Sequence, residues 1–474
     1  MLFNSLVFML FLPLVFTIYW ALAKQLRWQN LWIFATSLFF YGWWDWRFLS
    51  LLIFTMTNDF LLGWWIDKTE NERKRKWLLV FSIVSNIGVL CVFKYYNFFL
   101  QSWADLWALF DIKISFSYWQ MILPIGISFY TFHSLSYTID IYRRKLQHTK
   151  DYIAFGAFIT FFPQLVAGPI ARATQLLPQF MKPKKFDFTL AKDGFRQMLW
   201  GLFKKVVIAD TLAMFVDEIF SHQQQMPGSM MWLGSLYFAI QVYADFSGYS
   251  DMAIGIAKMF SISLMKNFSL PFFSNNMAEF WHKWHISLST WFRDYIYIPL
   301  GGSQKGKWKY IYNISVVFAL SGLWHGPKWN YIWWGLLNVL YIAPVTLLFR
   351  ARNKEKSLQP KTYRDIPSML FTLILFTFSV GIFRTESTHL ALSLPSKLLQ
   401  FDIKFLTFFF DSIERFALEG LLFVVLLLFF EWINRSKEHP LQGKYAEWKT
   451  ILILGFILLF GIFSDYKAFI YFQF

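Results

Sequence analysis

Long apolar stretches recur from one end of this 474-residue chain to the other, and they constrain the fold more than any other feature. A hydrocarbon core about 30 Å thick needs about 20 apolar residues per helical span. Backbone N–H and C=O groups that lack hydrogen-bond partners are not tolerated in lipid. Because 56% of the residues are hydrophobic and only 16% are charged, little of the chain remains for a soluble domain. We therefore predict an all-α polytopic membrane protein, with residues 1–474 forming a single integral membrane domain.

The formal charge of +16 is distributed in a way that predicts topology. Its basic residues fall in short loops between apolar stretches, as at Arg73–Lys76 and after Tyr142, so we expect these loops to face the cytoplasm and do not expect a nucleic-acid partner. Span lengths and charges together predict about 11–12 crossings, with both termini outside the cytoplasm. Residues 450–474 then contain the final span and an extracytoplasmic C-terminal tail.

Two stretches do not fit a simple crossing. Residues 152–170 are apolar but contain Pro163, Gly168 and Pro169 and are flanked by basic segments, which favours either a re-entrant element or a broken helix buried in the bundle. Residues 261–310 are too polar to cross. We expect short helices there, dipping into the cytoplasmic half of the membrane.

Two tryptophan- and histidine-rich segments stand out, Trp281–Ser287 and Ser321–Gly326. Imidazole is costly to bury in lipid and titrates near neutral pH, so its presence indicates a polar cavity in which protons are handled. The simpler alternative is an interhelical hydrogen bond. An intramembrane enzyme is therefore the first hypothesis.

The spacing of the first segment predicts an aromatic-lined helix face. Trp281, Trp284, His285 and Leu288 share one side of a helix. His282 lies only three residues before His285, so spacing alone does not choose between the two histidines.

His325 follows a largely apolar span. The neighbouring Gly322, Gly326 and Pro327 should break the helix and open backbone room for a substrate. His282, His285 and His325 could together bind a metal, but no cysteine or third local ligand supports a site, and we predict none.

The same segments resemble a known family. Residues 281–295 and 321–326 look like the two signatures of the membrane-bound O-acyltransferases, in the branch that resembles bacterial alginate O-acetyltransferases. Residues 123–132, 162–170 and 243–251 fit the same branch. One departure is His133, where this resemblance leads us to expect glutamine.

The resemblance implies a helical bundle around a central tunnel and an acyl transfer across the membrane. A cytoplasmic thioester such as acetyl-CoA would be the donor substrate, with no bound cofactor, and a hydroxyl would attack its carbonyl. His325 matches the catalytic histidine of the family and His285 its second functional position. A positioned imidazole that removes the hydroxyl proton contributes typically about 10²–10⁴-fold, while His285 or a nearby donor would polarise the carbonyl.

Several other residues are candidates for the tunnel lining. These are Asp245, Asp251, His282, Trp284 and Trp324. Carboxylates inside an apolar span are usually functional or paired, so a hydrogen-bonding role for the two aspartates is an equal alternative.

Four charged residues have simpler interpretations. We expect Arg293 and Asp294 to form a local ion pair. We expect Lys204 and Lys205 to snorkel at the cytoplasmic face, rather than to attract CoA phosphates.

The last six residues, 469–474, form a Phe-x-Tyr-x-x-Phe pattern. In an aromatic-rich chain this is by default an interfacial anchor. It also resembles the tail of small partner subunits in D-alanyl transfer, where a tyrosine is proposed to carry the acyl group. We therefore hypothesise that Tyr471 is an acyl carrier on the outer side, with His325 as its base.

The favoured function is O-acetylation of a cell-envelope or exported polysaccharide from a multi-pass position in the bacterial inner membrane. The implied partners are the lipid bilayer, the polysaccharide and an extracytoplasmic soluble acetyltransferase resembling SGNH hydrolases. Two alternatives remain at this point. One is D-alanyl transfer to teichoic acid, and the other is a transporter that moves an acyl donor or glycan without chemistry.

Overall fold

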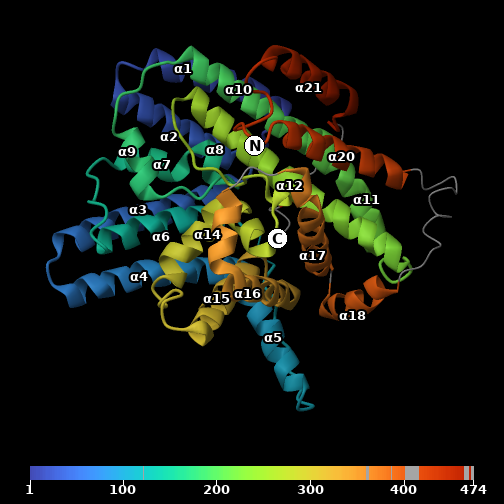
Figure 1. The fold of residues 1–474 in the computed structure, drawn as a ribbon. Coiled ribbons are helices and arrows are strands. Elements are labelled where there is room, and N and C mark those ends of the chain that lie inside the picture. The colour runs from blue at the N-terminus through green and yellow to red at the C-terminus, as the bar shows by residue number, and fades with distance from the viewer. Residues whose placement is uncertain (121, 359–361, 386, 401–415, 464–468, 471–474) are drawn as a thin grey trace. The chain divides into compact units, whose positions relative to one another are not determined.

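The structure is a computed structural model that describes all residues except 121, 359–361, 386, 401–415, 464–468 and 471–474 (Figure 1). Its regular elements are all helices, and no strand occurs among the described residues. This confirms the predicted all-α class. The chain divides into two compact units, unit 1 (residues 1–195 and 253–265) and unit 2 (residues 196–252 and 266–474).

Four helical stretches are long and apolar enough to cross a membrane by length and composition: Trp46–Lys68, Glu72–Ala108, Trp329–Leu348 and Tyr363–Arg384. A shorter apolar helix covers Leu6–Ala21. These stretches support the membrane-protein class. The larger number of about 11–12 crossings stays a prediction.

Unit 1 is built from helices that follow one another closely along the chain. They are α1 (Leu6–Ala21), α2 (Leu26–Gly42), η1 (Trp46–Phe48), α3 (Leu49–Lys68), α4 (Glu72–Leu90), η2 (Cys91–Tyr95), α5 (Tyr96–Ala108), α6 (Ile127–Tyr142), α7 (Tyr152–Thr160), α8 (Phe162–Leu165), α9 (Ala173–Phe180) and the first half of α10 (Phe188–Phe203). Local sequence sets several of their starts. Asn71 accepts hydrogen bonds from the N–H groups of Arg73 and Lys74 at the start of α4, and Asp151 caps α7 in the same way.

A buried polar cluster joins α3, α4 and α6, which lie side by side in unit 1 (Figure 1). Asp59 accepts hydrogen bonds from Ser82 Oγ at 2.8 Å and from Asn86 Nδ2 at 2.7 Å. Ser82 also shares a hydrogen bond of 2.9 Å with Thr138 on α6. Neutral donors thus satisfy a carboxyl group that is fully buried between three helices.

The stretch at 152–170 is a broken helix. α7 ends at Thr160 and α8 begins at Phe162, and both helices are buried in unit 1. Protein groups satisfy the backbone at the break, because Ser37 Oγ accepts from the N–H of Phe162 at 3.1 Å and Gln164 Nε2 donates to the carbonyl of Phe158 at 2.8 Å. The break is thus buried in protein, and whether this segment re-enters the membrane stays a prediction.

Unit 2 carries the two histidine segments. Its helices are the second half of α10, η3 (Lys204–Ala209), α11 (Asp210–Ser221), most of α12 (Gly228–Met259), η4 (Pro271–Phe273), α13 (Met277–Lys283), α14 (Ile286–Phe292), η5 (Arg293–Tyr297), α15 (Lys307–His325), α16 (Trp329–Leu358), η6 (Tyr363–Asp365), α17 (Ile366–Arg384), α18 (Thr388–Leu399), α20 (Phe416–Ile433) and α21 (Ala446–Phe460). The elements between residues 271 and 297 are short, as the polar sequence predicts.

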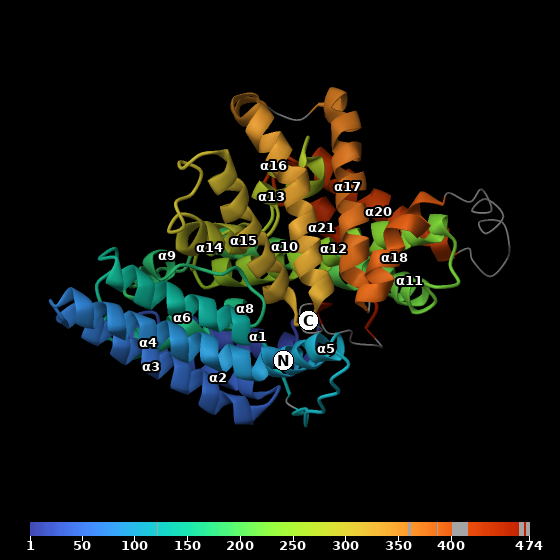
Figure 2. The same ribbon diagram turned by 90° about the horizontal axis from the view of Figure 1, so that it is seen from below.

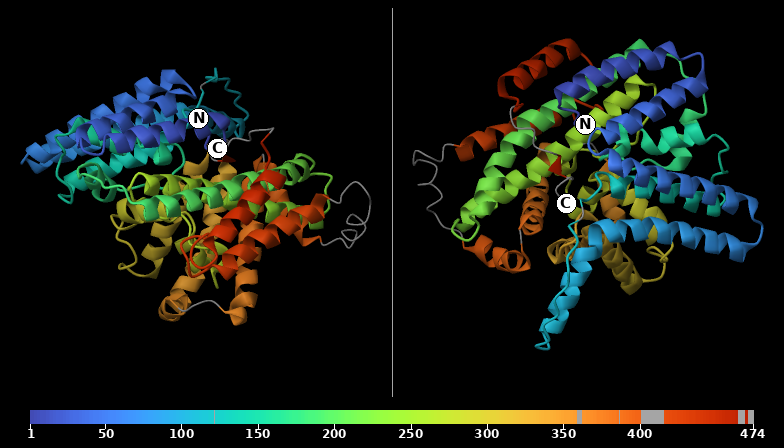
Figure 3. Two further views of the ribbon diagram at one scale, coloured as in Figure 1. Left: turned by 90° about the horizontal axis from the view of Figure 1, so that it is seen from above. Right: turned by 180° about the vertical axis from the view of Figure 1, so that it is seen from behind.

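Glycines let the helices of unit 2 approach closely. A Cβ atom at Gly201 on α10 would collide with the carbonyl oxygen of Gly248 on α12; α10 (green) and α12 (yellow-green) run side by side in Figure 3. α15 and α16 pack together in the same manner (Figure 2), and a Cβ at Gly322 would collide with the backbone of Tyr331. Close backbone approach at a glycine is typical of membrane helix pairs.

Candidate functional site

His285 lies at a sharp turn between two short helices, and not on the continuous helix that its spacing predicts. α13 ends at Lys283, Trp284 is extended, and His285 adopts the left-handed conformation with φ 44° and ψ 53° before α14 begins at Ile286. A left-handed backbone is uncommon for residues other than glycine and asparagine, so surrounding contacts must hold it. The prediction of one helix face for Trp281, Trp284 and His285 is therefore wrong.

Asn267 supplies those contacts. Its backbone carbonyl accepts from the N–H of Ile286 at 2.8 Å, and its Oδ1 accepts from Ser287 Oγ at 2.6 Å. The same Oδ1 lies 3.2 Å from His285 Nδ1, while its Nδ2 donates to Ser250 Oγ on α12 at 3.0 Å. Because an amide oxygen only accepts, Nδ1 of His285 must carry the proton. In the neutral ring, Nε2 is then a hydrogen-bond acceptor.

Aromatic rings enclose His285. Its side chain is 1% exposed, and its ring centroid lies 4.6 Å from Phe246 and 5.8 Å from Trp324. Burial, and secondly the nearby His325, hold the pKa of His285 well below its ordinary value. The imidazole is therefore neutral at neutral pH.

His325 is the last residue of α15, as the following Gly326 and Pro327 predict. Its ring centroid lies 5.0 Å from Trp324, 5.5 Å from Trp334 and 5.4 Å from Phe383. Trp324 thus contacts both histidine rings, so sequence segments 40 residues apart (325 − 285) meet in one aromatic cluster.

The glycines beside His325 do not leave an open space, contrary to the expectation from sequence. Cβ atoms at Gly322 and Gly326 would collide with the backbone and the ring of Tyr331, respectively. The absence of side chains at these positions brings α16 close to α15, which lets Trp334 reach His325. The glycines therefore shape the aromatic wall.

The structure separates His282 from the other histidines. His282 is exposed on α13, and its Nδ1 lies 2.6 Å from the carbonyl oxygen of Ala278. Trp284 is buried, with its ring stacked on Phe280 at 5.4 Å and tilted against Phe376 at 5.0 Å. Its contacts are those of a packing residue. Among the described residues, no group of three or more histidine, cysteine or acidic side chains could hold a metal ion.

Lys204 and Lys205 are buried and paired, and do not snorkel as expected. Lys204 lies 2.6 Å from Asp251, while Lys205 lies 2.8 Å from Asp245 and 2.9 Å from Asp210. Asp245 and Asp251 lie on different sides of α12, as their six-residue spacing requires, whereas Asp210 is the first residue of α11. Asp245 and Asp251 therefore have ion-pair partners, which accounts for their presence in the helix.

The prediction for Arg293 and Asp294 is confirmed by an ion pair of 2.7 Å. Tyr471 lies outside the described residues.

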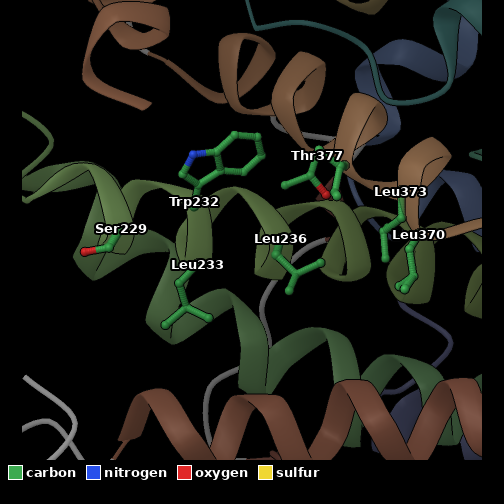
Figure 4. A pocket seen from close by; sticks show the side chains of 8 residues that line it. Ser229, Trp232, Leu233, Leu236, Leu370, Leu373 and Thr377 are labelled. Atoms are coloured by element: carbon green, nitrogen blue, oxygen red, sulfur yellow. The ribbon is translucent and has the colours of Figure 1, made fainter. Parts of the chain in front are cut away.

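A cavity of about 280 Å³ lies between α12 and α17, and neither His285 nor His325 is among the residues that line it (Figure 4). Its walls are mainly apolar, and Leu236 is ten residues before Phe246 on α12, or about 15 Å along a helix. With the hydroxyls of Ser229 and Thr377 as its main polar groups, it lacks titratable side chains for acyl transfer. We assign the candidate site to the two-histidine cluster.

Residues 74–383, which include this cluster, match the family "MBOAT, membrane-bound O-acyltransferase family". The chain belongs to the membrane-bound O-acyltransferases. It is therefore a membrane acyltransferase, and the alternative of a transporter without chemistry is set aside. The family assignment also confirms the predicted fold class.

Full-length relatives place the chain within this acyltransferase family. It is 35% identical to "Probable alginate O-acetylase AlgI" of Pseudomonas putida over 100% of both chains. It is 31% identical to "Peptidoglycan O-acetyltransferase" of Helicobacter pylori over 100% of this chain and 98% of that one. It is 27% identical to "Teichoic acid D-alanyltransferase" of Bacillus subtilis over 57% of this chain and 71% of that one.

Sequence reasoning missed Asn267, which holds the His285 turn in this acyltransferase. It also missed the role of Lys205 as the partner of two carboxylates. The signal available for Lys205 was its occurrence in an apolar stretch that also contains Asp210, since buried charges are usually paired. No local pattern marks Asn267, because its partners lie 17 to 20 residues away.

Proposed function

We propose that this acyltransferase moves an acetyl group from cytoplasmic acetyl-CoA across the bacterial inner membrane for O-acetylation of a cell-envelope or exported polysaccharide. The observation that carries the proposal is the pair of buried histidines that share Trp324 within the family segment. Both termini are extracytoplasmic in this proposal, and a soluble SGNH-hydrolase-like acetyltransferase outside the membrane completes the transfer.

His325 acts as the general base. A hydroxyl oxygen bonds to the thioester carbonyl carbon, the carbon–sulfur bond breaks, and the hydroxyl proton passes through His325 to the departing thiolate. The rings of Trp324, Trp334 and Phe383 support this role because they shield the imidazole from competing water.

His285 acts as a neutral partner in this mechanism. Its Nδ1 proton is directed at Asn267, so Nε2 accepts a hydrogen bond and is unsuited to donate one to a carbonyl. We therefore assign His285 to orientation of the attacking hydroxyl, and carbonyl polarisation to another donor. This replaces the role suggested by the resemblance.

Tyr471 is the first acceptor in the proposal. Its phenol oxygen takes the acetyl group as an ester and releases the CoA thiol, and a hydroxyl of the next acceptor then attacks that ester and restores the phenol. Replacing Tyr471 with Phe should leave the protein folded and abolish transfer to the final acceptor. Mass analysis of the C-terminal peptide after incubation with labelled acetyl-CoA should detect the ester in the wild type only. Undiminished transfer by the Phe variant would remove the carrier role.

The acyltransferase assignment itself is tested with the purified protein in nanodiscs and labelled acetyl-CoA. His325→Ala should lose release of CoA thiol and product formation, whereas His389→Ala, which changes an exposed histidine of the same unit, should not. A D-alanyl carrier-protein thioester supplied in place of acetyl-CoA distinguishes the D-alanyl alternative. Turnover of that donor alone would overturn the acetyl proposal.

A further inference from the structure

Two residues near the end of the chain, Phe469 and Ile470, are bound inside unit 2. The backbone N–H of Ile470 donates to Asp245 Oδ2 at 2.5 Å, and Phe469 and Ile470 are 2% and 4% exposed. A second backbone contact lies a few residues earlier, where the N–H of Ile462 donates to the carbonyl of Val206 at 3.0 Å. The segment before Tyr471 is therefore held by specific contacts and not only by apolar packing.

A buried ion pair prepares Asp245 for this contact. Lys205 Nζ lies 2.8 Å from Asp245 Oδ1, on the opposite oxygen from the one that binds Ile470. The same ammonium lies 4.6 Å from the ring centroid of Phe469, within the range of a cation–π interaction. The ring of Phe469 also contacts Tyr249 edge-on at 4.7 Å. Lys205 thus contacts the side chain of Phe469, and Asp245 binds the backbone N–H of Ile470.

One segment of α12, residues 245–250, contacts both the described part of the C-terminal tail, Phe469 and Ile470, and the residues that form the turn at His285. Asp245 and Tyr249 are four residues apart and share one helix face, which binds the tail. The next residues along, Phe246 and Ser250, form the neighbouring face, where Phe246 contacts the ring of His285 and Ser250 accepts from Asn267. One helix segment therefore sets the position of both groups.

We propose that Lys205 and Asp245 form a clamp that positions the C-terminal tail for acyl transfer. Consecutive Cα atoms are about 3.8 Å apart, so fixing Ile470 limits the reach of residue 471. This proposal rests on the proposed function, because it assigns a use to the tail. Lys205 and Asp245 are positioning residues in it and do not touch the reacting atoms.

The neighbouring pair of Lys204 and Asp251 provides a matched control. Asp251 lies on the same helix and accepts from the adjacent lysine at 2.6 Å, and the structure gives it no contact with Phe469 or Ile470 among the described residues. Asp245→Ala and Asp251→Ala each remove one carboxylate that pairs with a buried lysine. Only the first removes the acceptor for the tail.

The test measures hydrogen–deuterium exchange of the C-terminal peptide in the full-length protein in nanodiscs, together with acetyl transfer. Asp245→Ala should accelerate exchange at the Ile470 amide at least tenfold and lower kcat at least tenfold, with the KM for acetyl-CoA unchanged. Asp251→Ala should leave exchange of that amide unchanged. Asp245→Asn retains an acceptor oxygen and should restore part of the protection and of kcat.

Phe469→Ala provides a second variant if Asp245→Ala does not fold, because it weakens the clamp from the tail side and leaves the ion pair intact. Unchanged exchange in both Asp245→Ala and Phe469→Ala would overturn the clamp. Faster exchange with unchanged kcat would overturn its role in transfer. Failure of the proposed function is recognised separately, because wild-type protein would then not transfer acetyl groups while its C-terminal amide stayed protected.

Discussion

The two units bury similar polar groups but surround them differently. In unit 1, Asp59 accepts hydrogen bonds from Ser82 and Asn86, and no basic side chain pairs with it in the part of the chain that the structure describes. In unit 2, Asp245 is bound by the ammonium of Lys205 and by the backbone of Ile470. The neutral donors around Asp59 link helices that pack side by side. Asp245 instead links three distant parts of the chain, at residues 205, 245 and 470.

The histidines show the same contrast. His133 is fully buried on α6, and its ring lies 6.4 Å from Phe158. His285 and His325 instead contact a shared tryptophan, and the proton of His285 is directed by an amide. Burial of an imidazole alone does not indicate chemistry. In unit 2 the proton of one imidazole is directed and two imidazole rings meet at one tryptophan, and this arrangement supports the catalytic role that we propose for them.

The largest expected effect is a difference in acetyl-transfer rate between substitutions of His325 in unit 2 and His133 in unit 1. His325→Gln should lower acetyl transfer by about 10²–10⁴-fold, the typical contribution of a positioned general base. His133→Gln, which introduces the residue expected from the family resemblance, should stay within about twofold of the wild type. Initial rates with labelled acetyl-CoA measure both. Equal losses in the two variants would contradict the assignment of catalysis to unit 2.

Removing the Asp245 carboxylate should lower the free energy of unfolding more than removing the Asp59 carboxylate. Asp245→Ala leaves Lys205 paired with Asp210 alone and removes the acceptor of the Ile470 N–H. Each lost hydrogen bond to the charged group should cost about 1.5–3 kcal/mol. Asp59→Asn keeps the shape and one acceptor oxygen, but its amide group would face the donor of Asn86, at a cost of about 1–3 kcal/mol. Thermal unfolding in detergent compares the two variants. A larger loss for Asp59→Asn would reverse the comparison.

Asn267 tests whether the turn at His285 is required. Asn267→Ala removes the acceptor for His285 Nδ1 and for Ser287, and a lost buried hydrogen bond costs about 1–3 kcal/mol. If that energy positions the imidazole, transfer should fall by about 5- to 150-fold. Asn267→Asp retains an acceptor oxygen and should recover part of the rate. Full activity of the Ala variant would show that the turn is only structural.

Sequence reasoning succeeds where the determinant is local. Gly326 and Pro327 predict the end of α15 at His325, and the polar composition of residues 261–310 predicts short helices there. It fails at His285 because helical periodicity assumes a continuous helix, while Asn267 fixes a left-handed residue from 18 positions away. For Asp245 the sequence allows a hydrogen-bonding role but does not identify the partner Ile470, which is 225 residues distant. Single-sequence patterns contain no record of such contacts.

The smallest effect should be the pH dependence that His285 adds to stability. Because its folded-state pKa lies well below its ordinary value, the unfolded chain takes up a proton below about pH 6.5 that the folded chain does not. The contribution is therefore fully present above that pH and is lost as the pH falls, by up to about 1.4 kcal/mol per pH unit.

His285→Gln should reduce the slope of unfolding free energy against pH between about 5 and 6.5 by up to that amount. Unfolding in detergent across this range measures the slope for the wild type and for the variant. An unaltered slope in His285→Gln would mean that the folded protein protonates this ring as readily as the unfolded chain. The hydrogen bond to Asn267 would then not reflect a neutral imidazole, and the acceptor role of Nε2 in unit 2 would have to be abandoned.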